Sequence, residues 1–67
     1  MKNSIRLLRA ERGWSQAELA DNVGVSRNSI NSVENGKFDP SLPLAFRIAH
    51  AFGLAVEEVF DKDDAFR

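Results

Sequence analysis

The sequence predicts an all-α fold of five short helices. Apolar residues recur at helical spacing in several segments, and serines that can cap helix starts alternate with glycines that can end helices. The chain has 67 residues, of which 43% are hydrophobic, enough for one small core. We expect a single domain over residues 1–67, with the core at about 4–60 and a frayed acidic tail at 61–67.

The first helix is expected over residues 4–12. Ile5 and Leu8 have the spacing of an inward face, and Gly13 is placed to stop the helix. Trp14 follows this stop and is interpreted as a residue that fills the core just before the next helix.

A second helix is predicted to begin at Gln16. Ser15 and Glu18 have the spacing of a capping box, in which each side chain satisfies one backbone N–H group at the helix start. Gly24 is expected to end the helix by adopting a positive φ. The inward face is expected to consist of four apolar residues, Ala17, Leu19, Ala20 and Val23.

Ser26 is expected to cap a third helix directly after this turn, with Ile30 and Val33 facing inward. The turn is so short that the second and third helices have to cross, which is the arrangement of a helix-turn-helix motif. Asn35-Gly36 is a strong hairpin signal when it lies between strands. Here helical periodicity precedes it and no alternation follows, so it is interpreted as the end of the third helix.

Ser41 is expected to cap a fourth helix, in which Leu44, Ile48 and Phe52 recur every four residues as a core face. A short fifth helix is expected at residues 56–60. These two helices complete the predicted all-α fold.

The outward face of the third helix carries side chains suited to reading DNA. These polar residues are Arg27, Asn28, Asn31 and Ser32. A helix fits the major groove of B-DNA, where arginine can donate two hydrogen bonds to guanine and asparagine can pair with adenine. The third helix is therefore predicted to read base edges, and the alternative is a solvated polar face with no specific function.

The segment that starts at Arg9 resembles the Xre/Cro-like helix-turn-helix family, which includes the lambda-type phage repressors and many short bacterial regulators. The resemblance covers residues 5–60. It depends on Arg9 and on four motifs, Gly-Trp-Ser-Gln at 13–16, Leu-Ala at 19–20, Gly-Val-Ser at 24–26 and Glu-Asn-Gly at 34–36. It implies a compact five-helix, lambda-repressor-like domain that binds operator DNA, usually as a symmetric dimer.

The resemblance also implies roles for residues around the third helix. Contacts to the DNA backbone are expected from Gln16, Ser26, Asn35 and Lys37. Arg9 and Glu34 are expected to form a partly buried ion pair that ties the first helix to the third. Many relatives carry glutamine where this chain has Arg27, so we expect an operator that favours guanine at the corresponding position.

The charge of the chain is low for a DNA-binding protein, with a formal net charge of −1. It is unevenly distributed. Residues 1–50 carry seven Lys or Arg and five Asp or Glu, whereas residues 51–67 carry two and five. The acidic end can therefore point away from the phosphates. Arg6 and Arg12 are interpreted as solvated charges, and the alternative is a contact to phosphate.

Dimerisation is predicted from the aromatic content, because five phenylalanines in 67 residues exceed what one small core readily hides. Phe52 and Phe60 are expected to lie in that core. The candidates for an interface between subunits are Phe38, Leu42, Pro43, Phe46, Val59 and Phe66. A two-fold dimer would set its recognition helices about 34 Å apart and require a palindromic site.

The predicted function is that of a sequence-specific transcriptional regulator, most simply a homodimeric repressor acting on the nucleoid in the cytoplasm. The alternative is an antitoxin-like module that binds another protein and autoregulates through its helix-turn-helix. An enzyme is not expected, because His50 is the single histidine and no catalytic set accompanies it. No metal, cofactor, small-molecule ligand or membrane segment is expected, and a chain without cysteines has no disulfide or Cys-based zinc site.

Overall fold

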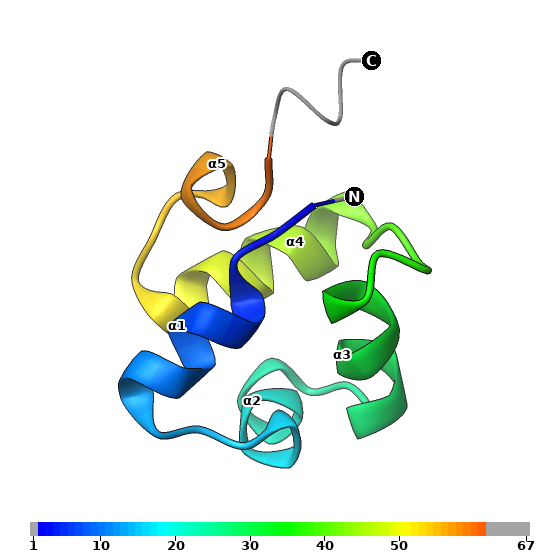
Figure 1. Ribbon diagram of the computed structural model, residues 1–67. Coiled ribbons are helices and arrows are strands. Elements are labelled where there is room, and N and C mark those ends of the chain that lie inside the picture. Colours follow the sequence, from blue (N-terminus) through cyan, green and yellow to red (C-terminus); the bar gives the residue numbers. More distant parts are fainter. Residues whose placement is uncertain (1, 62–67) are drawn as a thin grey trace.

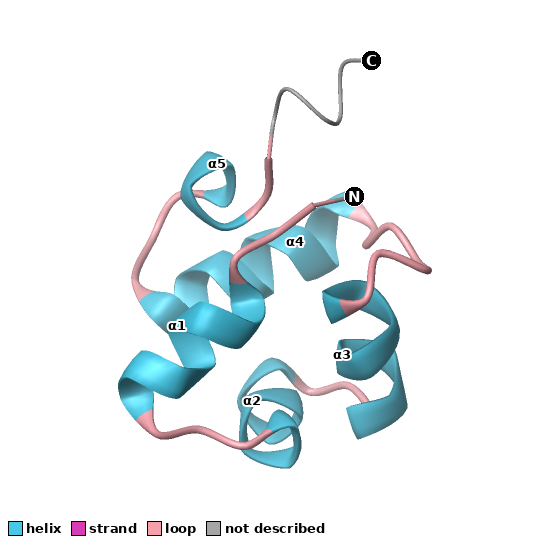
Figure 2. Ribbon diagram, viewed as in Figure 1, coloured by secondary structure: helices cyan, strands magenta, loops and turns pink. Residues whose placement is uncertain are grey.

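The computed structural model describes residues 2–61, which form five helices and no strand. Figure 1 shows α4 crossing the middle of the molecule, with α2 and α3 on one side of it and α5 on the other; Figure 2 shows the loops that join them. The predicted all-α, five-helix fold is confirmed. The helices are α1 (Ile5–Arg12), α2 (Gln16–Val23), α3 (Arg27–Glu34), α4 (Leu42–Phe52) and α5 (Val56–Val59).

Serine hydroxyls define three of the helix starts. The Ser15 hydroxyl accepts a hydrogen bond from the Glu18 amide at 3.0 Å, and the Glu18 carboxylate accepts one from the Ser15 amide at 3.1 Å. This is the predicted capping box. The Ser26 and Ser41 hydroxyls cap α3 and α4 by accepting hydrogen bonds from the Ser29 and Leu44 amides, respectively.

The start of α1 is capped by Asn3, whose importance the sequence did not reveal. Its side-chain oxygen accepts a hydrogen bond from the Ile5 amide at 3.2 Å, and its nitrogen donates to the Val33 carbonyl at 2.9 Å. Ser4 occupies the cap position without a side-chain hydrogen bond. Asn3 therefore joins the first turn of α1 to the last turn of α3.

The two ends of the described chain lie beside one another (Figure 1). Asn3 and Phe60 form an isolated antiparallel bridge, and the Asp61 amide donates to the Lys2 carbonyl at 2.9 Å. This backbone hydrogen bond joins Asp61, the first residue of the predicted tail, to the start of the chain. Residues 62–67 of the predicted tail, including Phe66, lie outside the described residues.

All five helices contribute to one core, and α4 contributes five of its residues. Ala17 was predicted to face this core but is exposed. The reason is helical geometry: Leu19 and Ala20 turn inward, and a position two residues before Leu19 lies about 200° around the helix. The core residues are Ile5, Leu19, Ala20, Val23, Ile30, Val33, Leu44, Ala45, Ile48, Ala49, Phe52, Val59 and Phe60.

Val59 is a core residue and not an interface candidate. Its side chain is 1% exposed, so a partner could reach it only if α5 moved away from the rest of the fold. Phe52 and Phe60 are also buried, as expected. The prediction of Val59 at a subunit interface was wrong because the four residues of α5 are too few to show which face turns inward.

Arg12 is exposed, as expected for a solvated charge, but its guanidinium also has partners in the fold. Its guanidinium donates to the Phe52 carbonyl at 2.7 Å and lies 5.1 Å from the centre of the Phe52 ring. The Trp14 ring stacks on the same ring, with centroids 5.4 Å apart. Arg12 therefore satisfies a carbonyl at the end of α4 and covers an aromatic pair.

Candidate nucleic-acid interface

A three-residue turn presents α3 at the surface. Gly24 adopts φ 79° and its amide donates to the Ala20 carbonyl at 2.8 Å, which ends α2. Val25 follows, and Ser26 then caps α3. Because α2 and α3 are joined so tightly, they form the predicted helix-turn-helix.

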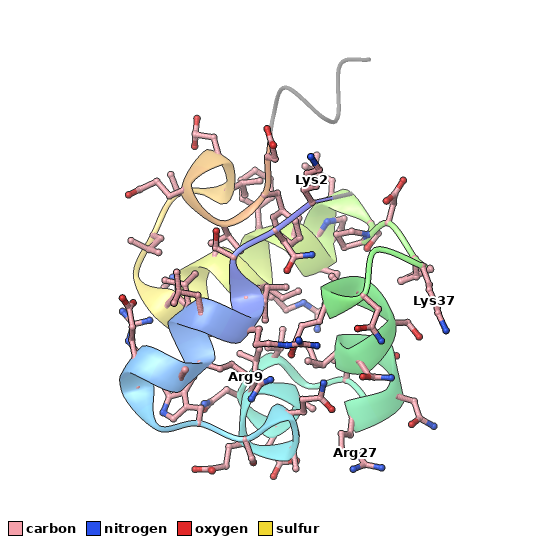
Figure 3. The ribbon with its side chains drawn as sticks, in the orientation of Figure 1. Lys2, Arg9, Arg27 and Lys37 are labelled. Carbon is pink, nitrogen blue, oxygen red and sulfur yellow. The ribbon has the colours of Figure 1, made fainter. Side chains whose placement is uncertain are left out.

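The orientation of α3 is set by its buried residues. Ile30 is 0% exposed and Val33 is 1% exposed, so the opposite face must turn to solvent. Arg27, Asn28 and Asn31 lie on that face and are exposed, whereas Ser32 is half-buried. Figure 3 shows Arg27 pointing away from the body of the molecule at the start of α3.

Polar residues also occupy the two ends of α3. The Ser26 hydroxyl at its start accepts a hydrogen bond from the Ser29 amide at 3.1 Å. At the other end, the backbone of Asn35 is in the right-handed helical region with φ −80°, and that of Gly36 is in the left-handed region with φ 73°. Lys37 follows as an exposed side chain, which points outward in Figure 3.

Arg9 and Glu34 form an ion pair between α1 and α3. The Arg9 Nε and Nη2 atoms donate to the two Glu34 carboxylate oxygens at 2.8 and 3.0 Å. The Arg9 side chain is 14% exposed and that of Glu34 is 1% exposed. Arg9 Nη1 also donates to the Trp14 carbonyl at 2.9 Å, so the guanidinium joins α1, the loop before α2, and α3.

Gln16 connects this ion pair to the surface of α3. Its Nε2 donates to Asn31 Oδ1 at 3.1 Å and to Glu34 Oε2 at 3.5 Å. Asn35 Nδ2 donates to the same Asn31 oxygen at 3.4 Å. Five of the predicted site residues thus form one polar cluster: Arg9, Gln16, Asn31, Glu34 and Asn35. Arg27, Asn28 and Lys37 stand apart from it.

Arg6, interpreted from sequence as a solvated charge, also lies beside this ion pair. Its Nε lies 3.6 Å from Glu34 Oε1, while its side chain remains 75% exposed. Arg6 precedes Arg9 by three residues, a spacing that places both on one helix face, and this spacing could have identified it. Glu34 cannot neutralise both arginines, so Arg6 adds positive charge beside α3.

The described part of the chain offers little for other chemistry. Within residues 2–61 no group of three or more His, Cys, Asp or Glu side chains could hold a metal ion. His50 is exposed in the last turn of α4. None of the helices in these residues has the length and apolar character needed to cross a membrane.

Comparison with known proteins places the chain among DNA-binding regulators. An uncharacterized HTH-type transcriptional regulator of Methanocaldococcus jannaschii is 47% identical over 64 residues, which are 96% of this chain and 97% of that protein. Antitoxin HipB of Escherichia coli K12 is 30% identical over 84% of this chain and 64% of its own length.

Solved structures give the same result. The restriction-modification controller protein C.AhdI of Aeromonas hydrophila matches with a TM-score of 0.78 and 34% identity over 84% of this chain and 85% of its own. SinR of Bacillus subtilis, in its crystal structure in complex with DNA, matches with a TM-score of 0.72 and 28% identity over 79% and 86%.

The family assignment follows from these similarities and from the match of residues 5–59 to the helix-turn-helix family. That family consists of transcription regulators, which are not enzymes. Because the match spans most of the chain, this protein belongs to the Xre/Cro-like helix-turn-helix family of DNA-binding transcriptional regulators.

Proposed function

We propose that this chain is a sequence-specific repressor that binds a palindromic operator as a homodimer, with α3 in the major groove. The exposed face of α3 carries the proposal. Arg27 and Asn28 lie in its first turn, and their side chains match the acceptors of guanine and the mixed edge of adenine. The buried inner face of the same helix fixes the position of their backbone against the core.

The residues at the ends of α3 support this orientation. Ser26, Asn35 and Lys37 flank the exposed face, where they can contact phosphates on either side of the groove. The side-chain NH2 group of Gln16 is already hydrogen-bonded to Asn31 and Glu34, so Gln16 could contact a phosphate only by giving up one of these bonds. SinR, which is similar to this chain, has been crystallised with DNA. Since DNA is the proposed ligand, we place the protein in the cytoplasm, where it would block the polymerase at an operator.

Exposed apolar side chains in the loop after α3 and on α4 support the homodimer. Phe38 is 49% exposed, Leu42 is 65% exposed and Phe46 is 58% exposed. Leu42 and Phe46 are one helical turn apart on α4, with exposed Pro43 between them in sequence. Burying this patch against a second copy would remove apolar surface from water and compensate for a small core.

Arg27→Ala is expected to weaken binding to the operator by about 1 to 3 kcal/mol, because a bidentate contact to guanine is lost. The loss should be confined to one base pair in each half-site, which becomes tolerant of all four bases. Titration of the wild-type and variant proteins against the operator and its single-base variants, at a fixed salt concentration, measures both effects.

Lys37→Ala is expected to weaken binding to all sequences to a similar extent. An exposed lysine just after α3 is suited to contact a phosphate. Its loss should reduce the slope of the logarithm of the binding constant against the logarithm of the salt concentration by about 1 per subunit. Binding to specific and non-specific duplexes is measured over a series of salt concentrations. Equal loss of base discrimination from Lys37→Ala and Arg27→Ala would contradict this division of roles.

An antitoxin-like function is the second candidate. The similarity to antitoxin HipB and the exposed patch of Phe38, Leu42 and Phe46 favour it, because such a patch suits a cognate protein as well as a second copy. Both candidates bind DNA, but this one alone needs a protein partner. Co-purification of the tagged chain with the product of an adjacent gene would separate the two.

A further inference from the structure

The buried ion pair determines which way the amide of Gln16 points. Glu34 accepts two hydrogen bonds from Arg9 and a longer one, at 3.5 Å, from Gln16 Nε2. A carboxylate can only accept hydrogen bonds, so the Gln16 atom beside it has to be the nitrogen. Because Glu34 is held on both oxygens by Arg9, it offers Gln16 a fixed acceptor.

The orientation of Gln16 in turn determines that of Asn31. The same Gln16 nitrogen lies 3.1 Å from Asn31 Oδ1, and Asn35 Nδ2 approaches that oxygen at 3.4 Å. Two donors therefore converge on the Asn31 oxygen, which has two lone pairs. Asn31 Nδ2 has no hydrogen-bond partner within residues 2–61, and Asn31 is exposed on the outer face of α3. Its two N–H groups are thus available to a ligand, whereas its oxygen is occupied.

We propose that the Arg9–Glu34 pair, acting through Gln16, holds Asn31 as a hydrogen-bond donor toward DNA and so makes Asn31 a reader of guanine. This inference rests on the proposed DNA-binding function. Asparagine reads adenine by donating to N7 and accepting from the N6 amino group, which requires a free side-chain oxygen. A side chain that can only donate matches guanine, whose major-groove edge carries the acceptors N7 and O6.

Side-chain amide hydrogen exchange tests the orientation without DNA. In the isotopically labelled protein the side-chain NH2 group of Gln16, which is hydrogen-bonded, is expected to exchange several-fold more slowly than that of Asn31. The exposed side-chain NH2 group of Asn28, for which the structure shows no hydrogen bond, is the matched control. Slower exchange at Asn31 than at Gln16 would show the opposite orientation and overturn the inference.

Selection of bound sites from randomised DNA tests the base preference. Asn31→Ala identifies the base pair that Asn31 contacts, and the wild-type protein is expected to favour guanine over adenine there by about tenfold or more. Gln16→Met keeps the side-chain length but removes the donor, so Asn31 can rotate and the preference should fall to about threefold or less.

Three outcomes of the selection would contradict the inference. A wild-type preference for adenine at this pair would show that the Asn31 oxygen is free to accept. Uniform weakening by Asn31→Ala, with no change of base preference, would assign its N–H groups to a phosphate. Absence of any selected sequence would reject the proposed function and with it the base preference, while the exchange rates would still report the amide orientation by themselves.

Discussion

Replacing Arg9 with methionine is expected to lower the free energy of unfolding by about 3 to 5 kcal/mol. The Glu34 side chain is 1% exposed, and Arg9 donates two hydrogen bonds to its carboxylate. Without the guanidinium a buried negative charge would lack its main partner, because Arg6 is 3.6 Å away and largely solvated. A domain of this size has only a few kcal/mol of stability, so the variant should be largely unfolded at 25 °C. Urea denaturation followed by circular dichroism measures the loss.

The double variant Arg9→Met, Glu34→Met is the control for this prediction. It removes both charges together, so the cost of an unpaired buried carboxylate disappears and the variant should recover at least half of the lost stability. A cost below about 1 kcal/mol for Arg9→Met alone would show instead that the pair behaves like a solvated surface ion pair.

Replacing Ile30 with alanine is expected to lower the free energy of unfolding by about 2 to 5 kcal/mol, because it opens a cavity beneath α3. Ile30 is 0% exposed and anchors α3 against the core. The loss should appear as a lower midpoint of urea denaturation, while the slope of the free energy of unfolding against urea concentration stays unchanged. Ile30→Val, which removes one methylene, should cost about 0.5 to 1.5 kcal/mol and serves as the graded control.

DNA binding by Ile30→Ala distinguishes a folding defect from loss of a contact. Ile30 faces the core, so its substitution should weaken DNA binding only by unfolding the protein. Operator DNA at about 100 times its dissociation constant should restore about 2.7 kcal/mol and recover the folded helix signal. Failure of excess operator to restore the fold, or a changed base preference in the folded fraction, would contradict this assignment.

The helix boundaries could be predicted because their signals are local. The Ser15 and Glu18 capping box and the glycine at the end of α2 act within a few residues of the sequence, and the structure has them as expected. The resemblance to a known family supplied the five-helix arrangement. The fold was therefore accessible from sequence almost in full.

The errors and omissions concern contacts between segments distant in sequence. Arg12 donates to the Phe52 carbonyl, 40 residues away, and no local pattern indicates this. Asn3 caps α1 but also bonds to Val33, at a separation of 30 residues. Val59 was assigned to a surface because the helix that contains it is shorter than two turns. Packing between distant elements decided each of these positions.

The candidate site was predicted as a set of residues rather than as an arrangement. Sequence placed Gln16, Asn31 and Asn35 near α3 but gave no indication that their amides are hydrogen-bonded to one another. The orientation of these amides depends on Glu34, whose carboxylate is held by Arg9 of α1. The roles toward DNA of all the predicted base-reading and backbone-contacting residues remain predictions.

Selection of bound fragments from randomised and genomic DNA, with the Arg27→Ala, Asn28→Ala double variant in parallel, tests the central claim most directly. Both substituted residues are exposed in the first turn of α3, so the fold should be unaffected and only base reading should be lost. We expect a palindromic consensus that the wild-type protein enriches and the double variant does not. No enrichment by the wild-type protein at moderate salt would contradict the claim that α3 reads DNA sequence.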